Sequence, residues 1–376
     1  MKFLFLIQGE GNGHLTQAVA LFQMLKTEGH EVVAALIGSS GGNRKPDFFC
    51  KSVTCPVYAY KSAGLSYSRS GKLEVGTTLA GFIRAIPDIS ASLRYIDSVV
   101  KSTGPDLIVN FFEICGGLYN FFFRNTIPVA CIAHQYLFLH PDFRFPGKRK
   151  LQRCALTFLS RVTAWGARDI YALSFADSYA SDPRVRVVPP LLRREVTEGL
   201  PSRGDHILVY LTQPLLRRQI EKWHRRNPTV KLHCFCNNPY QKTGFAVDDT
   251  LTFHPTDTQT FIELLRTCRA LVTTAGFESV CEAMLLGKPV MMVPVPNHFE
   301  QECNALDASL NHIGTVSKNF DLDRLFEYLP HHRSGAEPAR QWLEQAPRLI
   351  LSPLISSAAA GQAESCLPVV KAVPQG

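Results

Sequence analysis

Two kinds of apolar pattern alternate along this chain: short unbroken runs, and longer stretches in which apolar residues recur every three or four positions. The first kind is typical of strands buried on both faces, and the second of helices that cover such strands. We predict strands at 2–7, 31–37, 105–110, 127–132, 185–188, 206–211, 231–236, 250–253, 269–274 and 290–293. Their alternation with helices predicts an α/β fold with two Rossmann-like domains built on parallel sheets.

A proline pair marks the middle of the chain. A length of 376 residues predicts two domains, and Pro189-Pro190 followed by 191–195 has the character of a linker. We therefore expect domains at 1–190 and 191–340, followed by a C-terminal segment at 341–376. From Ser352 onward this segment is rich in Ala, Ser and Pro, which predicts poor order.

Composition narrows the class of protein. Apolar residues make up 45% of the chain and charged residues 19%, as in globular proteins. The net charge of +8 favours anionic partners, but no zinc-finger or RNA-binding motif occurs, so we expect no nucleic acid. Eleven cysteines without a Cys-x-x-Cys pair predict reduced thiols and a cytoplasmic location. No signal peptide is recognised, and no run reaches the roughly 18 apolar residues of a membrane span.

The stretch 273–305 carries the clearest chemical signal. It predicts a buried strand, a turn at Gly276, a helix to about Leu286, a second strand, and a further helix opened by Glu300 and Gln301. The start of a helix presents free N–H groups and a positive dipole end, which suit a phosphate. Glu282 lies about two turns further along, where it suits a pair of ribose hydroxyls.

A glycine-rich turn follows the first strand. Gly9, Gly11 and Gly13 lead directly into His14, but this is not the dinucleotide fingerprint, because the third glycine comes one residue early. An imidazole has a pKa near the working pH of most enzymes, so His14 is a candidate general base. Capping the helix or binding an acceptor phosphate are the other roles open to His14.

Together these two stretches resemble the inverting nucleotide-sugar glycosyltransferases of the GT-B fold. The resemblance extends to the branch near the lipid-linked N-acetylglucosaminyltransferases and to the UDP-glycosyltransferases. It implies that Gly276 with Ser279 holds the donor diphosphate, Glu282 the ribose, and Glu300 with Gln301 the sugar hydroxyls. It further implies that His14 faces the cleft as the base, and that a C-terminal helix crosses back to the first domain. The chain departs from the plant pattern at Thr274, where that pattern has His, and at Glu278, where it has Asn.

The same resemblance nominates further site residues. The strand at 105–110 ends where relatives carry acidic residues: Phe111 stands in place of an Asp, and Glu113 is a candidate to orient His14. We expect the acceptor to contact Gly13, His134 and Gln135, although His134 and Gln135 are as readily explained as structural. On the donor side the resemblance nominates Thr212 for the phosphates, and Phe253 with His254 for the base.

These residues predict an inverting sugar transfer. A nucleotide-activated sugar would react with an acceptor hydroxyl deprotonated by His14, and the helix start at Gly276 would stabilise the leaving diphosphate. The resemblance alone implies UDP as the nucleotide. No metal or other cofactor is expected, because the helix dipole and its hydrogen-bond donors can take the place of an ion beside the diphosphate. A UDP-sugar epimerase of the same fold and a non-catalytic nucleotide-sugar-binding subunit are the alternatives.

The segment 143–170 has the pattern of a membrane-surface helix. It begins with aromatic and basic residues and continues as an amphipathic stretch with Arg153, Arg161 and Arg168. A solvated helix packed on its own domain explains the pattern as well. In the first case the protein would work at the inner face of the membrane, on a lipid or cell-envelope glycan precursor.

Overall fold

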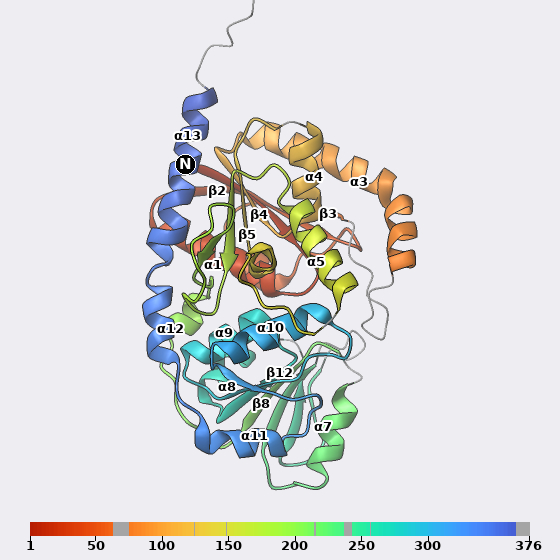
Figure 1. Cartoon of the computed structure of the whole chain (residues 1–376), viewed down its shortest axis with the longest axis vertical. Helices are drawn as coiled ribbons and strands as arrows, with labels where there is room; N and C mark the ends of the chain where they lie inside the picture. The colour runs from red at the N-terminus through yellow and green to blue at the C-terminus, as the bar shows by residue number, and fades with distance from the viewer. Residues whose placement is uncertain are drawn as a thin grey trace, which may run out of the picture.

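The chain folds into two α/β units stacked one above the other (Figure 1). The computed structural model describes residues 1–62, 75–123, 125–147, 149–213, 216–236, 243–255 and 257–365, with the backbone alone at 75–86 and 363–365. The prediction of two Rossmann-like units is confirmed, and the segment 191–195 lies between the last strand of one sheet and the first strand of the other.

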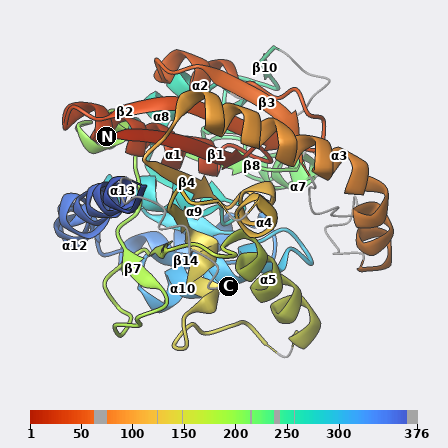
Figure 2. The same cartoon turned by 90° about the horizontal axis from the view of Figure 1, so that it is seen from above.

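The first sheet has the order β3-β2-β1-β4-β5-β6-β7, with every pair parallel. Its strands are β1 Lys2–Gln8, β2 Glu31–Ser39, β3 Val57–Lys61, β4 Leu107–Phe111, β5 Val129–Ala133, β6 Asp169–Leu173 and β7 Arg186–Val188. Its helices are α1 Gly13–Thr27, α2 Asp47–Ser52, α3 Val75–Thr103, α4 Ile114–Phe123, the 3-10 helix η1 His134–Leu139 and α5 Lys150–Thr163. Figure 2 shows α3, α4 and α5 on one side of this unit and α13 on the other.

The second sheet has the order β10-β11-β9-β8-β12-β13-β14, in which only the β10–β11 pair is antiparallel. Its strands are β8 Ile207–Leu211, β9 Leu232–Cys236, β10 Phe245–Ala246, β11 Leu251–His254, β12 Ala270–Thr273, β13 Val290–Met292 and β14 Gly314–Val316. The helices from the linker onward are α6 Arg194–Thr197, α7 Arg217–His224, α8 Thr258–Thr267, α9 Phe277–Leu285, α10 Phe299–Leu310, α11 Asp323–Tyr328, η3 Leu329–His331, α12 Ala336–Leu343, the π-helical η4 Pro347–Leu351 and α13 Ser352–Ser365.

Each sheet has one point where the strand order reverses. In the first sheet it lies between β1 and β4, and in the second between β8 and β12. Ligands of open parallel sheets bind beyond the carboxyl ends of the strands at such points. The glycine-rich turn follows β1, and the turn at Gly276 follows β12. The two stretches singled out in the sequence therefore stand at the two reversal points.

Two predicted elements differ from the structure. The helix predicted within 143–170 ends at Thr163, because Gly166 (φ 69°) turns the chain back and residues 169–173 join the sheet as β6. The predicted disorder from Ser352 is wrong as far as Ser365, where the chain forms α13. Leu354 and Ala358 are buried against the first unit, and the Ser357 hydroxyl donates to Asp169 at 2.6 Å. The segment beyond Ser365 lies outside the described residues.

Candidate active site

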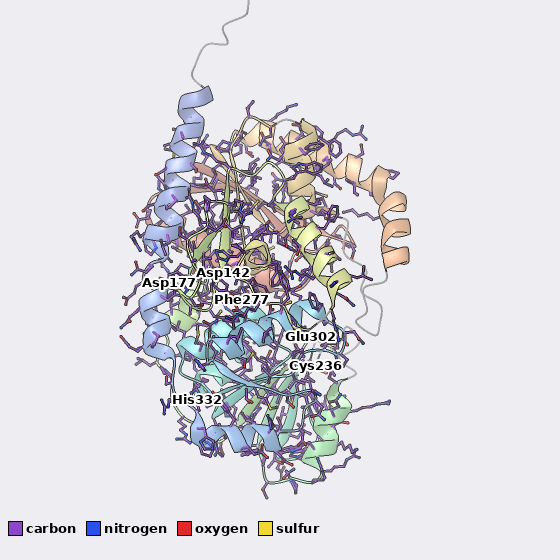
Figure 3. The ribbon with its side chains drawn as sticks, viewed as in Figure 1. Asp142, Asp177, Cys236, Phe277, Glu302 and His332 are labelled. Atoms are coloured by element: carbon purple, nitrogen blue, oxygen red, sulfur yellow. The ribbon has the colours of Figure 1, made fainter. Side chains whose placement is uncertain are left out.

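A cavity of about 460 Å³ lies between the two units and collects residues from both reversal points. From the first unit it is lined by the glycine-rich turn, His14, Gln17, Phe112 and Gln135; from the second, by the start of α9 and the start of α10. Phe277, at the start of α9, is labelled at the boundary between the two units in Figure 3. Of the sequence-predicted residues, Gly13, His14, His134, Gln135, Thr212, Gly276, Ser279, Glu282, Glu300 and Gln301 all line this cavity.

The turn after β1 is held by close backbone contacts. Gly9 donates its N–H to the carbonyl of Gly38 at 2.6 Å, and a Cβ at position 9 would lie 2.6 Å from that same oxygen. Gly11 has a φ of 86°, which favours glycine. Arg44 braces the turn from β2's side, with contacts to the Gly9 carbonyl and to the Asn12 side chain. The turn therefore delivers His14 into the cavity at the first turn of α1.

His14 occupies the middle of a hydrogen-bonded chain that crosses the cavity. Its Nδ1 lies 3.3 Å from Gln17 Oε1, and its Nε2 lies 3.4 Å from Gln135 Nε2. The side-chain amide of Gln17 donates a hydrogen bond to Glu278 at 2.6 Å, and that of Gln135 donates one to Glu300 at 2.9 Å. Both glutamates belong to the second unit, so the chain of contacts runs from α9 through the first unit to α10.

These contacts fix the tautomer of His14. Since Gln17 uses its N–H on Glu278, its oxygen faces Nδ1, which must then carry the imidazole proton. Nε2 is left as the lone-pair nitrogen and faces an N–H of Gln135. Burial lowers the pKa of His14 from 6.5 to about 4, so the ring is neutral near pH 7. A neutral imidazole with its basic nitrogen toward the cavity is the form that a general base requires.

The start of α9 forms the opposite wall. Gly276 is the N-cap residue and makes no side-chain cap, and the preceding Ala275 has a φ of 61°. Asn304 from α10 donates to the Ala275 carbonyl at 3.1 Å and so holds this turn. The Ser279 hydroxyl lies in the first turn, 3.1 Å from the Thr273 hydroxyl. The amide groups of this helix start and the positive end of its dipole therefore point to the cavity.

Aromatic contacts join the two walls. The ring of His134 stacks on Phe277 across the boundary, with centroids 3.9 Å apart and planes 15° from parallel. His134 Nδ1 donates to the Leu173 carbonyl at 2.7 Å, and burial lowers the pKa of His134 to about 4. In the first unit, the ring of Phe112 stacks on the ring of His14, with centroids 5.7 Å apart. These contacts hold both histidine rings in fixed planes.

Glu282 is paired with an arginine that sequence reasoning missed. Arg193, from the linker, donates to Glu282 Oε1 through Nε at 2.9 Å and through Nη2 at 2.5 Å. The glutamate side chain is 1% exposed and the arginine side chain 11% exposed. Among the described residues that line the cavity, Arg193 is the only Lys or Arg. No pattern in the linker pointed to it, because Arg193 and Arg194 are alike in sequence and only Arg193 turns inward.

Glu278 lies beside the helix start that would meet a phosphate. Burial raises its pKa from 4.5 to about 8, against the hydrogen bond from Gln17, which lowers it. Its Oε2 is buried without a hydrogen-bond partner. A protonated Glu278 carries no charge, so near pH 7 it would not repel a phosphate at this helix start.

The other donor-side residues have partly committed side chains. Gln301 Oε1 accepts the Val295 N–H at 2.8 Å, which leaves its amide N–H groups for a ligand. Thr212 accepts a hydrogen bond from the Thr274 hydroxyl at 3.1 Å, so the residue that replaces the histidine of the plant pattern is tied to the turn after β8.

The expected role of Glu113 is wrong. Its carboxyl contacts the Ser62 hydroxyl and accepts the Cys115 N–H at 3.2 Å, while both nitrogens of His14 have other partners. The cause is Phe112, which has a φ of 56° and places its ring, not the next carboxyl, against His14. Burial raises the pKa of Glu113 to about 7 in a separate small cavity of about 20 Å³. Phe111 is buried in the core of the first unit.

Phe253 and His254 do not line the cavity. Phe253 is buried in the core of the second unit and stacks on Phe245, because alternation along β11 turns it away from the cleft. His254 lies behind Phe235, with ring centroids 5.0 Å apart. The cavity wall in this region is formed by Phe235 and by the start of α8 with Asp257, Thr258 and Phe261. Among the described residues no group of His, Cys, Asp and Glu is arranged to hold a metal ion.

Comparisons with known proteins agree with this geometry. The chain resembles the solved structure of Phytolacca americana UGT2 with UDP-2-fluoro-glucose and pterostilbene (TM-score 0.62, 15% identity, 95% of this chain and 99% of that one). It also resembles the calicheamicin glycosyltransferase CalG4 (0.58, 18%, 98% and 99%) and the spinosyn rhamnosyltransferase SpnG with thymidine diphosphate (0.57, 13%, 97% and 100%). No curated protein matches the chain in sequence.

Two parallel-sheet units facing each other across a cavity, with these structural relatives, define the GT-B fold of nucleotide-sugar-dependent glycosyltransferases. The sequence profile of glycosyl transferase family 1 matches residues 1–331. The chain therefore belongs to glycosyl transferase family 1, and it is a glycosyltransferase.

Proposed function

We propose that this protein transfers a sugar from a nucleoside diphosphate donor, with UDP as the nucleotide, to an acceptor hydroxyl with inversion at the anomeric carbon. The observation that carries the proposal is the placement of neutral His14, with Nε2 as its basic nitrogen, across one cavity from the start of α9. The free thiols of the described cysteines fit the reducing cytoplasm that we expect.

The donor would lie along the second unit. The diphosphate meets the N–H groups at the start of α9 and the hydroxyls of Ser279 and Thr212, and the base lies between Phe235 and the start of α8. Glu282 accepts the ribose hydroxyls through Oε2, because both contacts from Arg193 are made to Oε1. Glu300 and the amide of Gln301 bind the sugar hydroxyls.

The acceptor would enter between Gln135 and His14. Its hydroxyl replaces the Gln135 N–H at His14 Nε2, donates its proton to that nitrogen, and attacks the anomeric carbon from the side opposite the diphosphate. Gln17 accepts from Nδ1 and stabilises the imidazolium that forms. The bond from the anomeric carbon to the diphosphate breaks, and the dipole and amides of α9 stabilise the departing charge.

A thermal-shift screen of nucleoside diphosphates and their sugars tests donor binding first. We expect UDP or a UDP-sugar to raise the melting temperature of the wild type and to lose this effect in Glu282→Ala. Product analysis of the identified donor, with and without an acceptor mixture, then tests transfer. Interconversion of the sugar without any acceptor would identify an epimerase, and binding without turnover would identify a non-catalytic subunit.

A further inference from the structure

An exposed aromatic surface covers the outer side of α4 and α5, away from the cavity. We call Phe121, Phe122, Leu151, Phe158 and Trp165 the α4–α5 surface. Their exposed fractions run from 43% at Trp165 and 44% at Phe121 to 64% at Phe122, 67% at Phe158 and 79% at Leu151. Figures 1 and 2 both show α4 beside α5 on the same side of the first unit. Large apolar side chains gathered on one face mark an interaction site.

Helix α5 carries apolar residues on two faces. One face buries Leu156 and Leu159 in the first unit. The other presents Leu151, Cys154 and Phe158 to solvent at helical spacing, and Trp165 continues this line just beyond the helix. The Trp165 ring stacks on Phe121 of α4, with centroids 3.7 Å apart, so the two helices form one continuous apolar surface.

The segment that contains α5 carries charge of a single sign. From Phe143 to Arg168 the sequence contains seven Lys and Arg residues and no Asp or Glu. Lys150, Arg153 and Arg161 are exposed on α5 itself. Basic residues beside exposed aromatic rings suit an anionic bilayer, whose headgroups pair with the cations while the rings enter the interface.

We propose that the α4–α5 surface docks on a membrane that contains anionic phospholipid. A nucleic acid fits less well, because Phe121 and Trp165 already stack on each other and Leu151, the most exposed of the five residues, has no ring on which a base could stack. A second copy of the chain fits less well because the surrounding cations of two copies would face one another. No helix in the described part of the chain is long and apolar enough to cross a bilayer.

Contacts at the base of α5 join this surface to the cavity. Arg149 pairs with Glu302 of α10 at 2.9 Å, and Arg153 lies over the ring of Phe145, which stacks on Phe299 at the start of α10. Leu159, on the inner face of α5, lines the cavity. Docking would therefore place the cleft beside the bilayer. If the proposed transfer is correct, an acceptor carried by a lipid would reach the cavity over α5. The docking itself does not depend on the proposed transfer.

Vesicle sedimentation tests the docking directly. The full chain is mixed with vesicles of phosphatidylcholine alone or of phosphatidylcholine with phosphatidylglycerol. We expect partitioning onto the mixed vesicles, weakened by added salt, and little onto phosphatidylcholine alone. Lys150→Glu with Arg161→Glu should weaken partitioning by at least about fivefold per charge. Phe122→Ser with Phe158→Ser should weaken it by about tenfold or more.

Matched variants on other surfaces serve as controls. Arg225→Glu with Arg226→Glu changes the net charge equally, and Leu200→Ser with Leu310→Ser removes exposed apolar residues elsewhere. Both should partition like the wild type, and circular dichroism with thermal melts shows that every variant is folded. No partitioning onto the mixed vesicles, or equal loss in the controls, overturns the proposal. The proposal is also overturned if Phe122→Ser with Phe158→Ser leaves vesicle partitioning unchanged but disrupts a dimer of the chain. The same holds if that double variant leaves partitioning unchanged but disrupts a complex with single-stranded RNA.

Discussion

The buried pair of Arg193 and Glu282 gives the sharpest prediction. Both guanidinium contacts go to one carboxylate oxygen, at 2.9 and 2.5 Å, and the carboxylate is 1% exposed. Replacing Arg193 by Met keeps most of the apolar stem but leaves the Glu282 charge buried without its cation. Loss of one partner from a buried pair costs about 3–5 kcal/mol, and we expect Arg193→Met to reduce the free energy of unfolding by that amount.

Removing both charges should restore stability. In Arg193→Met combined with Glu282→Leu no charge is buried, and apolar replacement of a buried pair is often neutral or stabilising. We expect the double variant to unfold within about 1 kcal/mol of the wild type. Arg194→Met is the matched control, because Arg194 is exposed next to Arg193; its change should stay within about 0.5 kcal/mol.

Urea unfolding followed by tryptophan fluorescence measures these differences, with separate fits if the two units unfold separately. Calorimetric titration with UDP then separates stability from binding: the double variant should be folded yet bind UDP far more weakly, because the proposed ribose acceptor is gone. Wild-type stability in Arg193→Met would show that Glu282 does not depend on Arg193. A double variant as unstable as the single one would refute the coupling.

Three further outcomes follow from the groups that line the cavity. His14→Asn should lower kcat by about 10²–10⁴-fold in a transfer assay while UDP affinity changes little; an unchanged kcat would remove His14 from the reaction. Since burial lowers the pKa of His14 to about 4, the acid limb of the pH profile of kcat/KM should lie below 6.5, and a limb above 6.5 would contradict a desolvated base. The raised pKa of Glu278 means that the folded state binds more protons than the unfolded state between about pH 4.5 and 8, so this group lowers stability as pH rises through that window. Glu278→Gln should flatten that fall, which melting temperatures across the window can measure.

The repeated pattern of the sequence was enough to predict the fold. Unbroken apolar runs such as 2–7 and 269–274 became β1 and β12, and the glycine-led turns after them fell at the reversal points of the two sheets. The prediction failed where local pattern competes with long-range pairing. Residues 169–173 fall within the stretch predicted to be amphipathic, and their pairing with β5 on one side and β7 on the other makes them a strand. The alanine-rich stretch after Ser352 is helical because the first unit covers Leu354 and Ala358.

The site could be predicted to the level of elements but less well to the level of contacts. His14 and the start of α9 were both nominated from sequence, and both line the cavity. The partner of His14 was misassigned. The positive φ of Phe112 places the Phe112 ring against His14, where the carboxyl of Glu113 was expected, and this backbone angle cannot be read from the sequence. Gln17 and Arg193 were missed for a related reason: their partners are more than 80 residues away, with sequence separations of 261 and 89.

Carboxyl groups line much of the cavity, and the two on α9, Glu278 and Glu282, are the ones whose charge is removed or paired. Glu10, Asp257, Glu278, Glu282 and Glu300 all line it. Glu282 is paired with Arg193, and the raised pKa of Glu278 keeps it protonated near pH 7. Glu10 accepts the Ser40 N–H, Asp257 caps α8, and Glu300 accepts from Gln135. The N–H groups at the start of α9 donate to none of these carboxylates. Because Glu278 is not ionised, the positive end of the α9 dipole keeps its full effect there. In the proposed reaction an anionic leaving group would be directed to that end of the cavity, across from the basic nitrogen of His14, and its binding would depend on Glu278 staying neutral.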